Sequence, residues 1–156
     1  GFGLVVVTAS LPTASLLGTR PVEVVALGGA IRRDELTCVG PVAAATLARF
    51  RFDLAIIGAG GLSAKWGLTE LDDGEAEIQR LAIERSARVV VIADGSKIGT
   101  AMNAIVTDVG AIATLVTDGS ASSTELSALA EAGLDIVIAG PNDDTPGAES
   151  RRTGST

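Results

Sequence analysis

Phe52-Asp53-Leu54-Ala55-Ile56-Ile57-Gly58-Ala59-Gly60-Gly61 is a short apolar run that ends in a turn with three glycines. The run leaves no room for a helix before its glycines, so it predicts a strand buried on both faces of a parallel sheet. Open α/β sheets bind ligands at the carboxyl ends of their strands, where bare glycine amides approach an anion. We therefore expect this strand at the centre of the sheet and its turn in a binding site.

The pattern of a buried strand followed by a small-residue turn recurs on both sides of this run. Helical segments separate the strands, and Ser122-x-x-Glu125 is a capping box at the start of one of them. We predict strands at residues 4–10, 22–27, 52–57, 88–93, 111–117 and 134–139, and helices at 12–17, 41–50, 75–87 and 124–132. Residues 62–73 are predicted to form an extended loop, and residues 98–108 are ambiguous. This alternation specifies an α/β fold with a mostly parallel sheet and helices on both faces.

The composition fits one domain within the 156 residues. Hydrophobic residues make up 47% of the chain but aromatic residues only 3%, so the core must consist of Val, Ile, Leu and Ala. Apolar runs are shorter than the roughly 18 residues of a membrane span, and the single Cys38 favours a reducing, cytoplasmic compartment. We expect the domain at residues 1–140, truncated at its N-terminus because a core strand begins at once, and a disordered tail at 141–156.

Charge and residue content exclude several functions. The net charge of −7 argues against nucleic-acid binding by this chain alone, because duplex binding depends on Lys and Arg. With no His and one Cys, a His-based zinc site, a thiolate cluster and a His-based catalytic triad are excluded, and we expect no metal and no cofactor. The turn at 58–63 lacks the third position of the dinucleotide fingerprint, and residues 94–97 do not form a P-loop.

Four predicted strand ends converge in such a sheet, at residues 8–10, 28–33, 58–61 and 94–97. They supply hydroxyls, bare amides, guanidiniums and an ammonium, which together suit a phosphorylated small molecule. The residues alone leave ordinary alternatives open. The glycine turns can lack a ligand, Lys97 can be solvated, and Arg32 can pair with Asp34 or Glu35 at the surface. Cys38 is expected in the core.

Seven segments in order resemble the C-terminal sensor domain of DeoR-type bacterial transcriptional regulators. They are residues 7–10, 26–32, 39–41, 58–62, 75–77, 93–97 and 116–118, within a span from about Leu4 to Ala139. The resemblance implies a fold similar to ribose-5-phosphate isomerase and CoA-transferases, with a sugar-phosphate effector site at the strand ends. It also implies homo-oligomerisation through this domain and an N-terminal winged helix-turn-helix, absent from this chain, that binds operator DNA.

The candidate effector-binding residues are Thr8, Ser10, Gly28, Gly29, Arg32, Gly58, Gly60, Gly61, Glu75, Glu77, Ser96 and Lys97. The chain departs from the family pattern at two of its positions: Ala9 stands where Asn is usual, and Gly60 stands where Asp is usual. The first strand of the family, with its phosphate-holding Asp-x-Gly-Thr-Thr loop, is also absent. These differences remove polar groups from the expected site.

The favoured hypothesis is a non-enzymatic, ligand-sensing and oligomerising domain of a sugar-metabolism repressor. A sugar-phosphate isomerase is the second hypothesis; it needs a carboxylate base beside Lys97, and Gly60 stands where an acid is wanted. The third hypothesis, suggested by Ala9 and Gly60, is an oligomerisation module that has lost its ligand.

Overall fold

The structure is a computed structural model, and it describes residues 3–140. The predicted tail at 141–156 lies outside the described residues.

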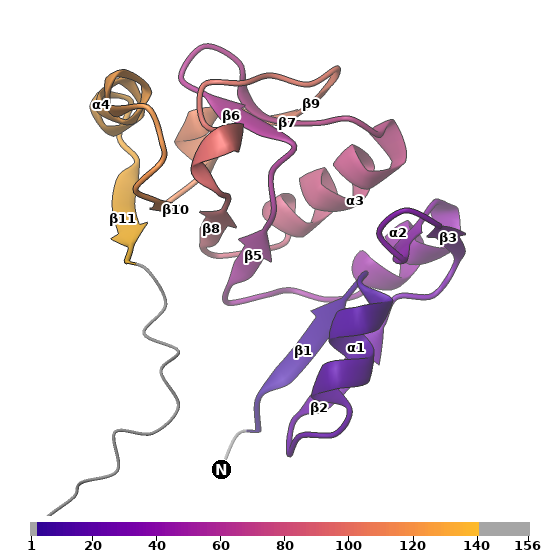
Figure 1. Cartoon of the computed structure of the whole chain (residues 1–156). Helices are drawn as coiled ribbons and strands as arrows, with labels where there is room; N and C mark the ends of the chain where they lie inside the picture. The colour runs from indigo at the N-terminus through magenta and orange to yellow at the C-terminus, as the bar shows by residue number, and fades with distance from the viewer. Residues whose placement is uncertain (1–2, 141–156) are drawn as a thin grey trace, which may run out of the picture.

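Parallel strands form the framework of the molecule (Figure 1). The main sheet has the strand order β11-β10-β8-β5, and a separate parallel pair joins β1 to β2. The bounds are β1 Val5–Thr8, β2 Glu23–Ala26, β5 Ala55–Ile57, β8 Val89–Ile92, β10 Thr114–Asp118 and β11 Asp135–Ala139. The predicted α/β fold and all six predicted strands are confirmed, but the strands divide between two sheets.

Strand β5 lies at the edge of the main sheet, so its predicted central position is wrong. The prediction that it is buried on both faces is also wrong. Ala55 and Ile57 are buried, whereas the side chain between them, Ile56, is 64% exposed. The physical reason is that neighbouring side chains on a strand point to opposite faces, and only one face of β5 packs into the main core.

Five short antiparallel strands were not predicted from the sequence. β3 (Ala30–Arg32) and β4 (Thr37–Val39) form a hairpin, while β6 (Gly61–Ser63), β7 (Gly67–Glu70) and β9 (Ala104–Thr107) form a three-stranded sheet. The predicted loop at 62–73 is therefore wrong. Strands of three or four residues, too short to show an alternating pattern, carry little signal in the sequence.

Four helices and two short 3₁₀ turns connect the strands. They are α1 Leu11–Leu17, α2 Pro41–Leu47, α3 Asp73–Glu84, α4 Ser123–Glu131, η1 Gly95–Lys97 and η2 Val109–Ala111. Half of the predicted capping box is confirmed: Ser122 Oγ accepts a hydrogen bond from the Glu125 amide, but Glu125 Oε1 accepts from the Ala64 amide rather than from that of Ser122. Gly133, just after α4, has φ +102°, a conformation that terminates helices and favours glycine.

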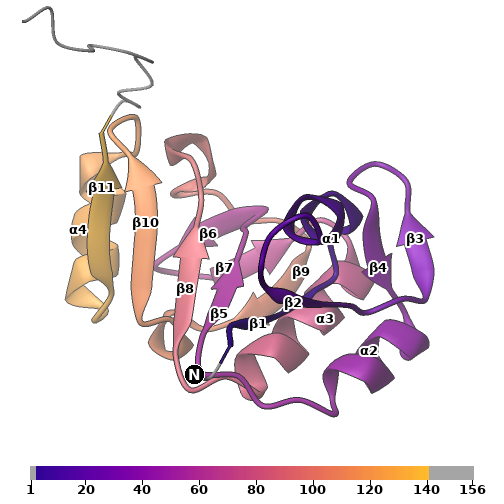
Figure 2. The same ribbon diagram turned by 90° about the horizontal axis from the view of Figure 1, so that it is seen from below.

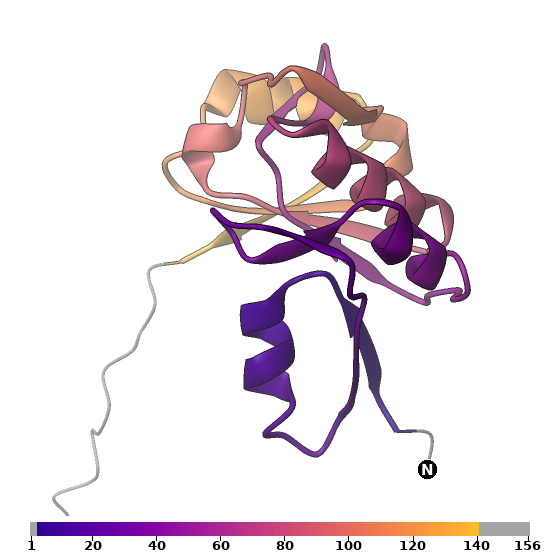
Figure 3. The ribbon, with the colours of Figure 1, turned by 90° about the vertical axis from the view of Figure 1, so that its right-hand side faces the viewer.

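Helices α3 and α4 cover one face of the main sheet. The side chains of Val91, Leu115 and Leu129 are fully buried there. Figures 2 and 3 show these helices on the same side of the sheet, and the indigo β1–α1–β2 unit stands apart from it in Figure 3. A second, smaller core joins that unit to α2 and α3 and includes Cys38, so the predicted core position of this cysteine is confirmed. Among residues 3–140, every helix is too short or too polar to cross a lipid bilayer.

Candidate functional site

The amide of Gly60 is held by a carboxylate of the same chain. The backbone N–H of Gly60 donates to Glu70 Oε1 at 3.0 Å, and Gln79 Nε2 donates to the same oxygen at 2.8 Å. Glu70 ends β7 and is 8% exposed, so its position is fixed by the antiparallel sheet that the sequence did not predict. The expectation of a bare amide at Gly60 is therefore wrong, because Glu70 already occupies the place of an anion.

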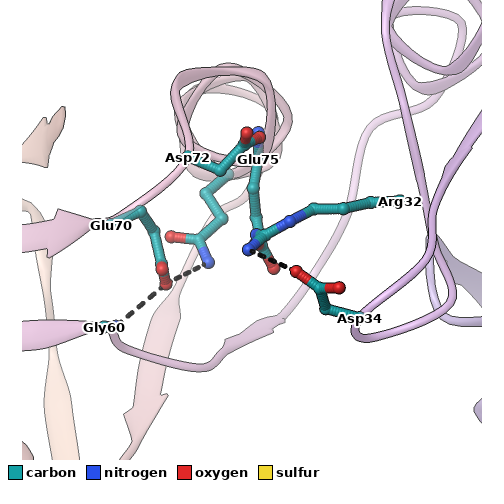
Figure 4. Close-up of polar contacts among 7 residues, drawn as sticks. Arg32, Asp34, Gly60, Glu70, Asp72 and Glu75 are labelled. Atoms are coloured by element: carbon teal, nitrogen blue, oxygen red, sulfur yellow. Dashed lines mark hydrogen bonds and ion pairs between the residues drawn. The ribbon is translucent and has the colours of Figure 1, made fainter.

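A second carboxylate holds Arg32, the last residue of β3. The Arg32 guanidinium forms a short ion pair with Glu75 on the first turn of α3, and a longer contact of 4.0 Å reaches Asp34 (Figure 4). Asp72 caps the helix by accepting from the Glu75 amide at 2.9 Å, which fixes where the Glu75 side chain leaves the helix. The predicted site residues Arg32 and Glu75 are thus brought together, and the Arg32 guanidinium is already paired.

The pKa of Glu75 is raised from its ordinary value of 4.5 to about 7. Burial of the carboxyl group is the main cause, because desolvation disfavours the charged form. The negative charges of Glu35 and Glu70 raise the pKa further, and the Arg32 guanidinium only partly offsets them. With this pKa, the Glu75 carboxyl group changes charge near neutral pH. Its side chain is 15% exposed, so this titration takes place in a largely enclosed site.

A cavity of about 240 Å³ lies between β1 and β5, beside this pair. Thr8 and Ser10 line it from the end of β1, Gly58 from the end of β5, and Glu75 from α3. These four residues come from three separate stretches of the sequence, and all four were predicted site residues. Of the four strand ends predicted to converge, those at 8–10 and 58–61 contribute to this cavity, between the two parallel sheets, whereas residues 28–33 and 94–97 do not line it.

Two polar side-chain atoms of cavity-lining residues lack a hydrogen-bond partner among residues 3–140. Thr37 Oγ1 and Gln79 Oε1 are buried and, within the described part of the chain, make no hydrogen bond. Buried polar atoms nearly always have a hydrogen-bond partner. Two such atoms without a partner, both from residues that line one cavity, indicate a place for a polar ligand. The sequence analysis missed both residues, and it missed Glu70 as well. The length of the predicted loop at 62–73 was the one signal that pointed near Glu70.

The turn at 94–97 is also closed by carboxylates. Asp94 Oδ1 accepts from the Ser96 amide at 2.9 Å, and Asp118 Oδ2 accepts from the Gly95 amide at 3.1 Å. Hydrogen bonds from Ser96 and from Ser120 are the main reasons why the pKa values of Asp94 and Asp118 lie below their usual range. This turn offers no free amide at these two positions.

The remaining predicted residues do not line the cavity. The segment that carries Lys97 runs beside the glycine turn, since the Gly99 amide donates to Leu62 O at 2.8 Å and Gly61 packs against Thr100. Gly28 and Gly29 follow β2, and Gly29 packs against the start of α2. Glu77 is exposed on α3 and Ser96 is exposed on its turn. Within residues 3–140, the structure shows no cluster of His, Cys, Asp and Glu suited to a metal ion.

Comparison with known proteins gives consistent matches. The family described as the DeoR C-terminal sensor domain matches residues 2–119. The chain is 33% identical over 131 residues to the HTH-type transcriptional regulator GlpR of Haloferax volcanii, a match that covers 84% of this chain and 51% of that protein. It is 30% identical over 137 residues to the HTH-type transcriptional regulator GolR of Listeria innocua, covering 87% and 54%.

A third relative is the glycerol-3-phosphate regulon repressor of Escherichia coli. The two chains are 30% identical over 95 residues, which covers 60% of this chain and 38% of the repressor. The chain spans about half the length of the first two curated relatives.

Proposed function

This chain belongs to the family of DeoR C-terminal sensor domains, and from that membership we propose that it binds a phosphorylated sugar or polyol in the cavity between β1 and β5. The whole protein is then a cytoplasmic transcriptional repressor of sugar metabolism. This chain senses the effector, and a helix-turn-helix segment outside it binds operator DNA. The repressor of the glycerol-3-phosphate regulon among the relatives supports a small phosphorylated polyol as the ligand class.

The observation that carries the proposal is a pair of unpaired polar atoms in the otherwise largely apolar wall of the cavity. Thr37 Oγ1 and Gln79 Oε1 offer hydrogen-bonding capacity to ligand hydroxyls, and Thr8 and Ser10 add two hydroxyls nearby. Arg32 and Lys97 are the cations available to a phosphate, because Arg32 contacts the cavity residue Glu75 and Lys97 follows the neighbouring strand end. A cavity with polar groups in its wall and one cation, Arg32, paired to its lining residue Glu75 suits a polyol that carries one phosphate group.

A thermal-shift panel tests the proposal. Glycerol 3-phosphate, pentose phosphates and hexose phosphates are compared with glycerol and with inorganic phosphate at tens of millimolar. A ligand at about 100 times its Kd stabilises the folded state by roughly 2.7 kcal/mol, which raises the Tm of a domain of this size by roughly 5–10 °C. Lys97→Ala should erase the shift and leave the unliganded Tm nearly unchanged.

A pair of threonine variants provides a matched control. Thr37 Oγ1 lines the cavity and Thr117 Oγ1 does not, yet both are buried and unpaired in the structure. Thr37→Val should weaken ligand binding roughly 2–10-fold, the loss expected for one hydrogen bond, whereas Thr117→Val should leave binding unchanged. If no sugar phosphate raises the Tm, or if both variants bind alike, the effector site is not here and the ligand-free module is the better hypothesis.

We also propose that the domain forms a homo-oligomer. The face of the main sheet opposite α3 and α4 carries Ile56, Ile92 and Val137, which are 64%, 49% and 46% exposed. Parallel sheets are ordinarily covered on both faces, so this apolar face supports a partner surface. Sedimentation that shows only monomers at micromolar concentration contradicts the proposal.

One observation favours the isomerase hypothesis enough to test it. A carboxyl group with a pKa of about 7 in a cavity suits a general base, and Glu75 is such a group. Steady turnover of a pentose phosphate by the parent, lost in Glu75→Gln, would establish an enzyme. Binding without turnover, which we expect, leaves the sensor function.

A further inference from the structure

Two strong donors at this site are engaged by carboxylates of the chain itself. Arg32 is paired with Glu75, and the Gly60 amide is paired with Glu70. A ligand phosphate is an anion that needs the same donors. The unliganded site therefore already contains groups that compete with the ligand for its own contacts.

The two carboxylates are held unequally. Glu70 accepts two hydrogen bonds, from the Gly60 amide and from Gln79, and it is 8% exposed at the end of β7. Within the described range 3–140, Glu75 has Arg32 as its one ion-pair partner, and it lies close to the charges of Glu35 and Glu70. Glu75 lies in the first turn of α3, and its residue lines the wall of the cavity. Glu75 is thus the carboxylate that an incoming anion displaces more easily.

We propose that Glu75 occupies the anion position of the unliganded site, that an anionic ligand binds by displacing its carboxylate from Arg32, and that this displacement takes up one proton. The proposal rests on the proposed function, since it concerns how the same site exchanges its internal anion for an external one. It makes Glu75 the residue that couples ligand affinity to pH.

Once its ion pair with Arg32 is broken, the neighbours of Glu75 do little to stabilise its negative charge. The charged groups that face it are Arg32 on β3, Asp34 and Glu35 in the β3–β4 turn, and Glu70 on β7, while Asp72 caps its own helix. The other elements packed on α3, namely α2, β4, β5 and β9, contain no charged residue within their bounds. Four carboxylates and one guanidinium surround it, so among residues 3–140 the guanidinium is the one neighbouring cation.

Loss of that cation together with the arrival of a ligand anion raises the pKa of Glu75 above its value of about 7 in the free protein. The bound form therefore holds a proton at pH values where the free form does not. By linkage, affinity for the anion is constant below about pH 7 and falls about tenfold for each pH unit above it, until the pKa of the bound form is reached.

Sulfate is the probe for the experiment, because its charge does not change near neutral pH, whereas a phosphate monoester titrates near pH 6. Sulfate binding to the full chain is measured by calorimetry at constant ionic strength, at about pH 6 and about pH 8, for the parent, Glu75→Gln and Glu84→Gln. Glu84 is an exposed carboxylate at the other end of the same helix, so its variant controls for the change in net charge.

We expect Glu75→Gln to bind sulfate about tenfold more tightly than the parent at about pH 8 and within about twofold of it at about pH 6. Glu84→Gln should keep the pH dependence of the parent. Repeating the parent titration in two buffers of different ionisation enthalpy measures proton uptake directly and needs no variant. Close to one proton per sulfate is expected at about pH 8, and close to none at about pH 6.

The outcomes separate this inference from the proposed function. If sugar phosphates bind but sulfate affinity is independent of pH, or Glu75→Gln behaves like Glu84→Gln, the displacement by proton uptake is wrong and the sensor function stands. If neither the parent nor Glu75→Gln binds sulfate, the anion position is wrong as well. If, in addition, no sugar phosphate binds, the proposed function is wrong too.

Discussion

Replacement of Gly60 by Ala is the most direct test of the carboxylate-filled glycine turn. A Cβ atom at position 60 would lie 2.8 Å from Glu70 Oε2, 3.0 Å from Thr69 O and 3.2 Å from Glu70 Cα. The first contact is with the end of a side chain, which can turn away, but turning away breaks the bonds that Glu70 Oε1 accepts from the Gly60 amide and Gln79. The second and third contacts are with backbone atoms of β7, which must shift by a few tenths of an ångström.

Two contributions set the magnitude. Overpacking a buried position costs about 1–3 kcal/mol. Loss of a hydrogen bond to a charged group costs about 1.5–3 kcal/mol when the group stays buried. Glu70 is 8% exposed, but its hydrogen-bond partner Gln79 lines the cavity, where water can replace one donor, so the two costs do not add fully. We expect Gly60→Ala to lower the free energy of unfolding by about 2 kcal/mol, equivalent to a fall in Tm of roughly 4–8 °C.

Chemical unfolding in urea measures this difference, with Gly58→Ala as the control. Position 58 lies in the same turn, and a Cβ there meets no atom within 4 Å, so the substitution should change stability by less than about 0.5 kcal/mol. A double-mutant cycle with Glu70→Ala should remove about half of the cost of Gly60→Ala, since the closest contact is then gone. If Gly60→Ala and Gly58→Ala are equally stable, or if the cycle shows no coupling, the contact between the turn and Glu70 is not as described.

Two further predictions concern stability. Gly67→Ala should cost about 3 kcal/mol or more in urea unfolding, because Gly67 has φ +68° and its Cβ would lie 2.1 Å from Thr107 O; Gly110→Ala, at an open position, should be nearly neutral. The free energy of unfolding of the parent, relative to Glu75→Gln, should be greatest below about pH 4.5 and fall as the pH rises to about 7. The folded state keeps the Glu75 proton over this range and the unfolded state loses it; a difference that does not vary with pH would contradict the raised pKa.

The parallel strands and the helices were predictable because their signals are local. Apolar runs such as 88–93 and 134–139 end in turn residues, and Ser122 with Glu125 marks a helix start in four residues. The apolar runs reflect burial of the strand, and the helix cap involves backbone groups that are close in the sequence. Tertiary contacts then had little to change, apart from shifting element ends by one to three residues.

The short antiparallel strands and the edge position of β5 were not predictable in this way. β6, β7 and β9 have three or four residues each, and β9 pairs with β7 across more than thirty positions of sequence. Nothing in the run 52–57 determines which strands flank it, and its apolar composition alone predicts burial on both faces. Ile56 shows the limit of that inference, because a side chain that resembles a core residue is exposed at the open face.

The site shows the same limit in chemical terms. The sequence places Gly60 where the family has Asp, and this difference predicts the loss of an acid from the turn. In the structure an acid is nevertheless present, because Glu70 Oε2 lies 2.8 Å from where a Cβ of residue 60 would be. Glu70 reaches that place only through the pairing of β6 with β7, which the sequence did not reveal. The missing carboxylate at position 60 is therefore no argument that the site has lost its function, since a side chain at position 60 and the Glu70 carboxylate would compete for one space.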